Sequence, residues 1–349
     1  MSIHVYHASS LAEFYDKFIS ASELLTENER KEGIKRVNDK LIWSRGQSSS
    51  RYSLLPSLLR NLSRITGDKK AYLKLVESFS MQHFSAMTNH INDSQHGNII
   101  DRNEVMQHYG VSTRYLDWTE RVETALGFAL QNHILFTDKM AESIEPPTVW
   151  VLAPSLLNYK VFEQIARTFG TSEFELIAEE LGEEVVRNAR EILSKSFKDD
   201  FKRSVEELLY IQDYKYTNII SLSAISDQRL AAGDRLYGLL HSKAFNPFLY
   251  TALRLFGDGI VIDKAILPLA VVQPSHNDRI VAQRGVFTVF PANSSPVELD
   301  GFAECEDCLC RIELDAAFDI ADQLKTAGFR LADLYPDMGT FSKAINSGI

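Results

Sequence analysis

The chain has 349 residues, of which 45% are hydrophobic and 24% charged, a composition typical of a globular protein with its own core. Its formal net charge of -10 argues against a broad basic surface of the kind that binds nucleic acid non-specifically. Neither a membrane-spanning apolar run nor a secretory leader is evident, so we expect no membrane partner. The three clustered cysteines are too few for a disulfide framework, which favours a reducing compartment and a cytoplasmic location.

The first half of the chain alternates predicted helices with two strands. Apolar residues at three- and four-residue steps predict helices, and short apolar runs bounded by Gly or Pro predict strands. In chain order we expect a helix at 10–22, a helix after Thr26, a strand at 41–46, helices at 69–91, 101–109 and 123–131, and a strand at 148–152. The helix after Thr26 is expected because Glu29 follows at the spacing of a capping box.

The second half is predicted to be helical and acidic first and strand-bearing later. The expected elements are a helix at 172–202 in a helical stretch reaching about residue 256, strands at 259–272, 280–290 and 309–314, and helices at 316–327 and 340–346. This order predicts an α/β fold of the α+β type. Its mixed, mainly antiparallel sheet lies in two halves that are flanked by helices and separated by a helical insertion. The acidic insertion is a solvated face, a partner surface or a lid.

The predicted organisation has four parts. We expect an N-terminal helical section at 1–40, the first half of the domain at 41–154, the helical insertion at 155–257 and the second half at 258–349.

Several common catalytic motifs do not occur in this sequence. It has no G-x-x-x-x-G-K-[ST], strand-linked G-x-G-x-x-G, H-E-x-x-H or G-x-S-x-G, so most ATPases, classical dehydrogenases, zincin proteases and α/β hydrolases lose support. Cys305, Cys308 and Cys310 have ligand-like spacing, but a structural zinc site needs four ligands and no second cysteine pair exists. We therefore predict no metal site, with Cys305 in a loop and the other two on one face of a strand.

Polar, chemically capable residues are concentrated in three segments with apolar surroundings, at 43–60, 106–129 and 279–287. Arg45 is the sharpest case, because an arginine that ends an apolar strand must be paired or face a ligand. Two interpretations stay open for it, contact with a ligand or an internal pair with Asp117. A structural ion pair between Arg114 and Asp117 is a further possibility.

These three segments resemble the FRG domain family. Trp43-Ser44-Arg45-Gly46 is similar to its aromatic-Arg-Gly motif, with Ser44 in the aromatic position. The family's further blocks, HYG…TRLLDWT…ALxFA, R-I-x-x-Q-x-G-x-F and a closing L-F-P-D, are similar to His108–Ala129, Arg279–Phe287 and Leu334–Asp337. The resemblance covers about residues 41 to 344, with 159–256 as a poorly matching insertion. It implies a bacterial protein with a role in phage defence or stress response.

The resemblance also implies one polar pocket, whose expected residues are Arg45, His108, Asp117, Thr119 and Gln283. A weaker resemblance, to ADP-ribosyltransferases, implies a reaction with NAD as the substrate. Arg45 is similar to the arginine of their first strand, and Asp117-Trp118-Thr119 stands in place of their Ser-Thr-Ser strand. Ala125 to Ala129 then resembles the A-x-x-F-A helix that follows. Gln283 falls where the superfamily has its Gln/Glu-x-Glu strand, but the catalytic glutamate is absent.

This second resemblance implies particular roles for the pocket residues. Arg45 would hold the phosphates, Thr119 and Gln283 the ribose, and Tyr109 the nicotinamide ring. Asp117 or Glu120 would be the carboxylate that stabilises positive charge on the ribose, and His108 would bind NAD or act on the acceptor.

Two other classes of function stay open. A nucleotide- or signal-binding interaction module would use the same pocket without catalysis, and the helical insertion would transmit the signal to a partner. A nucleic-acid-cleaving enzyme would use His108 together with Arg45. The expected small-molecule partner is nucleotide-like, and the protein or nucleic-acid acceptor of a transferase stays unspecified.

Overall fold

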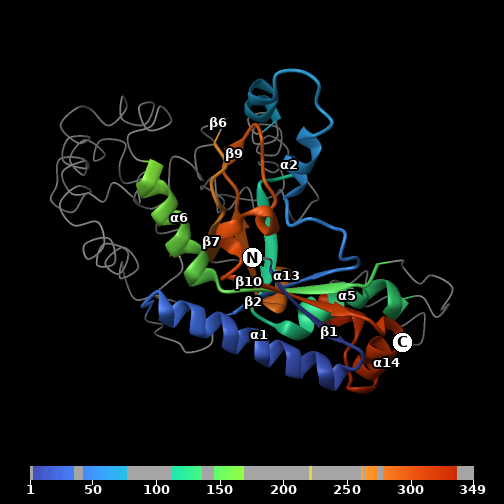
Figure 1. The fold of residues 1–349 in the computed structure, drawn as a ribbon. Helices are drawn as coiled ribbons and strands as arrows, with labels where there is room; N and C mark the ends of the chain where they lie inside the picture. Colours follow the sequence, from blue (N-terminus) through green and yellow to red (C-terminus); the bar gives the residue numbers. More distant parts are fainter. Residues whose placement is uncertain are drawn as a thin grey trace.

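The computed structural model describes residues 3–34, 42–76, 112–135, 145–168, 220–221, 261–262, 264–272 and 278–335. Within these ranges an eight-stranded sheet forms the centre of the fold (Figure 1). Its strands are β1 (His4–Ala8), β2 (Trp43–Gln47), β3 (Tyr115–Thr119), β4 (Thr148–Leu152), β5 (Ile220–Ser221), β7 (Leu269–Val272), β8 (Gly285–Val289) and β10 (Leu309–Leu314). A separate two-stranded sheet pairs β6 (Val261–Ile262) with β9 (Ala292–Asn293).

The strand order across the large sheet is β1-β10-β4-β2-β3-β8-β7-β5. The outermost pairs, β1 with β10 and β5 with β7, are parallel, and all the pairs between them are antiparallel. The prediction of a mixed, mainly antiparallel sheet is therefore confirmed. Two strands of it were not expected, because β1 and β5 lie in sections predicted to be helical.

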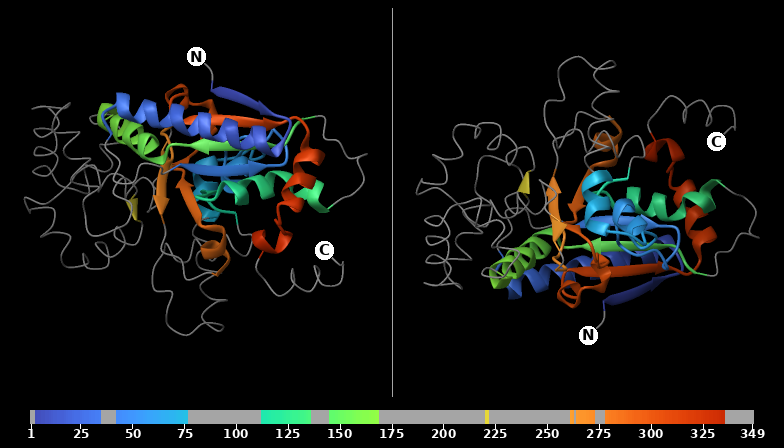
Figure 2. Two further views of the ribbon diagram at one scale, coloured as in Figure 1. Left: turned by 90° about the horizontal axis from the view of Figure 1, so that it is seen from below. Right: turned by 90° about the horizontal axis from the view of Figure 1, so that it is seen from above.

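Helices flank this sheet. They are α1 (Leu11–Lys31), α2 (Ser57–Leu62), α5 (Val122–Leu135), α6 (Pro154–Thr168), α13 (Asp278–Gln283), α14 (Ala317–Thr326) and α15 (Leu331–Leu334), with short 3-10 turns η3 (Leu299–Gly301) and η4 (Ala303–Cys305). Helix α1 packs on β1, β10 and β4, whereas α5 packs chiefly on β2. One end of α1 meets α14 and the other meets α6, as Figures 1 and 2 show. Among the described residues, none of the helices combines the length and apolarity that a membrane span requires.

The N-terminal region forms one helix where the sequence predicted two. Ser10 is the N-cap of α1, and its hydroxyl accepts a hydrogen bond from the Glu13 amide at 3.2 Å. The Glu13 carboxylate in turn accepts from the amide of Ser9, the residue before the N-cap, at 2.7 Å, an arrangement one residue away from that of a capping box. Thr26 lies inside the helix, and its hydroxyl donates to the Ser22 carbonyl oxygen at 2.6 Å. The Thr26 pattern was misleading because a Thr hydroxyl can bond one turn back instead of capping.

The predicted strand at 280–290 is a helix followed by a strand. Residues up to Gln283 form α13, and β8 begins at Gly285. Arg284 lies between them with a φ of 46°, a left-handed conformation that reverses the chain direction locally. Periodicity does not separate a short apolar helix from a strand, which accounts for the error. Gln283 therefore ends a helix in this structure, and it does not lie on a strand.

Other predicted elements agree with the structure more closely. The predicted strands at 41–46, 148–152 and 309–314 correspond to β2, β4 and β10, and the helices at 123–131 and 316–327 to α5 and α14. The region 259–272 contains two strands, β6 and β7, instead of one. The helix expected at 69–91 is described for residues 69–76 only, and those at 101–109, 172–202 and 340–346 lie outside the described residues.

Candidate functional site

The central strands β2 and β3 are paired at a single position. Ser44 lies opposite Thr119, whereas β2 pairs along its whole length with β4, and β3 pairs along its whole length with β8. Arg45 is the next residue of β2, so it lies where the pairing with β3 stops. Its register partner on the other side is Trp150 of β4. From this position the Arg45 side chain reaches the main chain of β3 at Asp117.

The Arg45 guanidinium makes one hydrogen bond among the described residues. Its Nη1 donates to the main-chain oxygen of Asp117 at 2.5 Å, and the Asp117 Oδ2 atom lies 4.0 Å away, beyond hydrogen-bond range. The Arg45 side chain is 20% exposed and that of Asp117 is 62% exposed. The Nε atom of Arg45 is buried and has no hydrogen-bond partner within the described part of the chain. This arginine is thus only partly satisfied by the fold.

Burial dominates the electrostatics of Arg45. Removal of the guanidinium from water lowers its pKa, the Asp117 carboxylate raises it, and the positive charge of Arg60 lowers it further. A guanidinium has five N–H donors and is costly to bury without acceptors. An anion bound here would accept from Arg45 and would also offset its repulsion with Arg60. The geometry can therefore hold a phosphate or carboxylate group.

Thr119 and Gln283, two expected pocket residues, are in direct contact. The Thr119 hydroxyl donates to the main-chain oxygen of Gln283 at 2.6 Å and accepts from the Arg121 amide at 3.0 Å. The second bond satisfies a free amide next to the start of α5. The Gln283 side-chain amide donates to the main-chain oxygen of Leu334. Both polar groups therefore link parts of the fold in this structure, and their predicted contacts with ribose stay predictions.

The structure brings the sequence motifs together around α5. Gly46 of β2 lies directly under Ala125 and Ala129 of this helix. On another side of α5, the Tyr335 hydroxyl donates to the Gln131 side chain at 3.0 Å, and the Tyr335 ring lies edge-on to Phe128. The closing motif that begins at Leu334 thus packs on the helix that follows the Asp-Trp-Thr strand. Segments far apart in sequence form one unit next to Arg45.

The remaining expected residues are placed as follows. His108 and Tyr109 lie outside the described residues. Glu120 is half-buried, and its amide donates to the Arg284 main-chain oxygen at 3.2 Å, so it stays close to the β3–α13 junction. Arg114 is buried and donates to the main-chain oxygen of Phe290.

The three cysteines are buried and unoxidised. Cys310 lies on β10, Cys308 directly precedes that strand, and Cys305 ends η4. Burial raises the pKa of the Cys305 thiol and raises that of Cys310 to about 12. A zinc ligand must be a thiolate, and this environment favours the neutral thiol.

The sequence analysis did not single out Trp150, the register neighbour of Arg45, or Arg311, the next residue across the sheet. Trp150 lies between Arg45 and Arg311 in the strand register, and the Arg311 guanidinium lies 5.4 Å from the centre of its ring. The Trp150 Nε1 atom donates to the Gln47 side chain at 2.7 Å, which fixes the ring. The position of Trp150 between two arginines follows from the strand register alone. The sequence of β4 predicts only a uniformly buried strand.

Fold and site together define a mixed α/β protein with a partly buried arginine at the centre of its sheet, whose Nε has no hydrogen-bond partner among the described residues. The family model of the FRG domain matches residues 40–137, a range that contains β2, α2, β3 and α5. The chain therefore contains an FRG domain, and Arg45, Asp117 and Thr119 all lie within it. No curated protein and no solved structure matches the chain.

Proposed function

We propose that the FRG domain binds NAD through Arg45 and transfers ADP-ribose from it. The observation that carries this proposal is the Arg45 guanidinium, which is largely buried, makes one hydrogen bond to the fold and has a buried Nε without a partner among the described residues. Two phosphates of NAD supply the acceptors that such a group needs. Arg60, close enough to lower the pKa of Arg45, adds a second positive charge for a diphosphate.

The reaction breaks the C–N bond between nicotinamide and ribose. Nicotinamide leaves with the bonding electrons, an acceptor nucleophile forms the new bond to the ribose carbon, and the acceptor gives up its proton. Positive charge develops on the ribose in the transition state, so a nearby carboxylate stabilises that state more than the ground state. Asp117, whose side chain is 62% exposed beside Arg45, is the carboxylate that we assign to this role, with Glu120 as the alternative.

A second candidate is a nucleotide-binding interaction module without catalysis. It is favoured by the hydrogen bonds of Thr119 and Gln283, which tie α5, α13 and α15 together. A ligand that bound the Thr119 or Gln283 side chain would have to compete with these hydrogen bonds. The catalytic glutamate of ADP-ribosyltransferases is also absent from this sequence. Ligand binding at Arg45 would then shift the contacts among these helices without bond cleavage.

The test measures NAD binding and nicotinamide release by the parent protein and by two variants, Arg45→Ala and Asp117→Asn. Cell lysate is included to supply acceptors. The transferase predicts that Arg45→Ala weakens binding at least about tenfold, as expected for loss of a charge-assisted contact of about 1.4 kcal/mol or more. Asp117→Asn should leave binding within about threefold while release falls at least about 100-fold.

Arg64→Ala is the matched control, because Arg64 is an exposed arginine of the same region. Binding by the parent without release favours the interaction module. No binding of NAD by the parent contradicts the transferase, and it leaves the interaction module only with a nucleotide other than NAD. A role in bacterial defence predicts that the parent protein, and not Arg45→Ala, lowers phage plating when it is expressed in a susceptible host.

A further inference from the structure

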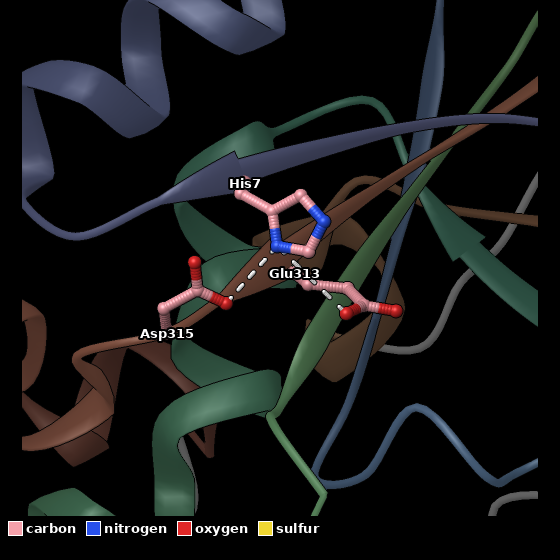
Figure 3. Close-up of side chains that lie close together, drawn as sticks. All are labelled: His7, Glu313 and Asp315. Carbon is pink, nitrogen blue, oxygen red and sulfur yellow. Dashed lines mark hydrogen bonds and ion pairs between the residues drawn. The ribbon is translucent and has the colours of Figure 1, made fainter.

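A cluster of three possible metal ligands lies at the β1–β10 edge of the sheet, away from the central β2–β3 junction. His7 is on β1, Glu313 is on β10, and Asp315 follows β10 directly (Figure 3). The His7 Nδ1 atom lies 3.1 Å from Asp315 Oδ1 and 3.9 Å from Glu313 Oε2. All three donor atoms lie within 4.8 Å of one another. The imidazole thus lies between two carboxylates.

The strand register, and not chance proximity of flexible side chains, places these residues together. β1 and β10 run parallel with His7 opposite Glu313, so the two side chains project from the same face of the sheet. Asp315 is two residues beyond Glu313, and its amide donates to the Ala8 main-chain oxygen at 2.9 Å. This bond continues the β1–β10 pairing past the end of the strand. The backbones that carry the three ligands are therefore fixed relative to one another.

We propose that His7, Glu313 and Asp315 bind one divalent cation of the zinc type. Two carboxylates bring two negative charges to a space that one such ion would neutralise. An imidazole nitrogen beside carboxylate oxygens suits zinc and neighbouring transition ions better than magnesium or calcium, which prefer oxygen ligands only. Zn–N and Zn–O distances of about 2.0–2.2 Å require the donors to close in by modest side-chain rotation. Water completes the coordination from the solvent side.

The surroundings position one ligand and leave the others accessible. The second oxygen of Glu313, Oε1, forms an ion pair with the Arg311 Nη2 atom at 2.8 Å, whereas Oε2 is the oxygen that lies near His7. The Glu313 side chain is only 15% exposed, whereas those of His7 and Asp315 are 58% and 43% exposed. An ion can therefore enter from solvent. The positive charge of Arg311 reduces the attraction for a cation, so moderate affinity is expected.

A bound ion would act as a clamp between the first and last strands of the fold. β1 leads into α1 at Leu11, and β10 leads into α14 at Ala317, both close to the cluster. Since β10 is the one strand that pairs with β1 in the described ranges, a metal bridge would hold the N-terminal strand in the sheet. This role is separate from Arg45, so success or failure of the NAD proposal leaves it unaffected.

The test uses the untagged full-length chain and titrates Zn²⁺ by calorimetry into the parent, His7→Ala and Asp315→Asn. His4→Ala is the matched control, because His4 is an exposed histidine on the same strand whose side chain projects from the other face. The parent and His4→Ala should bind one more ion than His7→Ala, and Asp315→Asn should bind at least about tenfold more weakly. Differences between variants are decisive, because the chain has other histidines.

The melting temperature supplies a second readout. Zn²⁺ should raise Tm in the parent and in His4→Ala, and this rise should be absent in His7→Ala, because an ion that binds only the folded site stabilises it by mass action. Equal zinc stoichiometry and affinity in the parent and His7→Ala would overturn the proposal. So would an Asp315→Asn variant that binds as tightly as the parent. Binding of Ca²⁺ or Mg²⁺ in preference to Zn²⁺ would contradict the assignment of His7 as a ligand.

Discussion

Gly46 and Ala125 bring a strand and a helix into backbone contact. A Cβ atom built on Gly46 would lie 1.8 Å from the Ala125 carbonyl oxygen and 2.6 Å from the Ala129 amide nitrogen. These neighbours are main-chain atoms, which cannot rotate away as a side chain can. The glycine after Arg45 is therefore required by the close approach of α5 to β2, and the small residues of α5 are required for the same reason.

Gly46→Ala should destabilise the protein severely, by about 3 kcal/mol or more, because the methyl group forces α5 off the sheet. Denaturant unfolding of the purified variant measures this directly. Gly67→Ala is the matched control, since a Cβ there meets no atom within 4 Å, and its effect should stay within about 0.5 kcal/mol. Equal stability of the two variants would show that α5 does not approach β2 this closely.

Ser10→Ala should cost about 1 kcal/mol of unfolding free energy, because it removes the N-cap hydroxyl of α1. Thr26→Ala should change stability by less than about 0.5 kcal/mol, because Thr26 lies inside the helix and bonds one turn back. Both are hydroxyl deletions on one helix, so each controls for the other. A larger loss in Thr26→Ala would restore the two-helix prediction for this region.

Arg45→Met should keep the unfolding free energy within about 1 kcal/mol of the parent or raise it. Burial of the guanidinium is costly, and the described residues offer it one hydrogen bond, to the Asp117 main-chain oxygen, and a carboxylate 4.0 Å away. Residues placed for ligands commonly cost stability. Arg64→Met, at an exposed position, is the control. A loss of about 3 kcal/mol or more in Arg45→Met alone would identify Arg45 as a structural ion-pair residue instead.

Stability should fall with rising pH in alkaline solution, in part through Cys310. Burial first, and the neighbouring Cys308 second, raise the pKa of the Cys310 thiol to about 12, against roughly 8.5 in the unfolded chain. The contribution of the neutral Cys310 thiol to the free energy of unfolding is complete below about pH 8.5. Above it the unfolded state binds fewer protons than the folded state, so unfolding becomes easier by up to about 1.4 kcal/mol per pH unit until about pH 12.

Cys310→Ala isolates this contribution from the other alkaline titrations. Its unfolding free energy should be lower at neutral pH because of the lost packing, and it should decline less steeply between pH 8.5 and 10 than that of the parent. The measurement is denaturant unfolding at a series of pH values under reducing conditions. Identical slopes for the two proteins would contradict the buried thiol as the cause.

Local sequence patterns predicted the helices and strands that neighbouring residues along the chain determine. Strand β10 was predicted with its observed limits, because its buried apolar residues alternate with Arg311 and Glu313 over the second part of the strand. The prediction of a strand at 280–290 was wrong because the short apolar run Ile280–Ala282 fits either a helix or a strand, and the left-handed Arg284 separates the two elements. Strand β1 was missed because a five-residue edge strand with mixed burial has little pattern of its own.

The sequence by itself determined that the chain is a mixed α/β protein with an FRG domain, and that Arg45 needs a partner or a ligand. It could do so because polar residues in apolar surroundings are costly wherever they are placed. Only the tertiary structure decided that Asp117 and Arg60 lie near this arginine, and that Thr119 and Gln283 bond to the backbone. It also brought His7 beside Glu313 across 306 positions of chain, because strand register is a long-range property that no local pattern encodes.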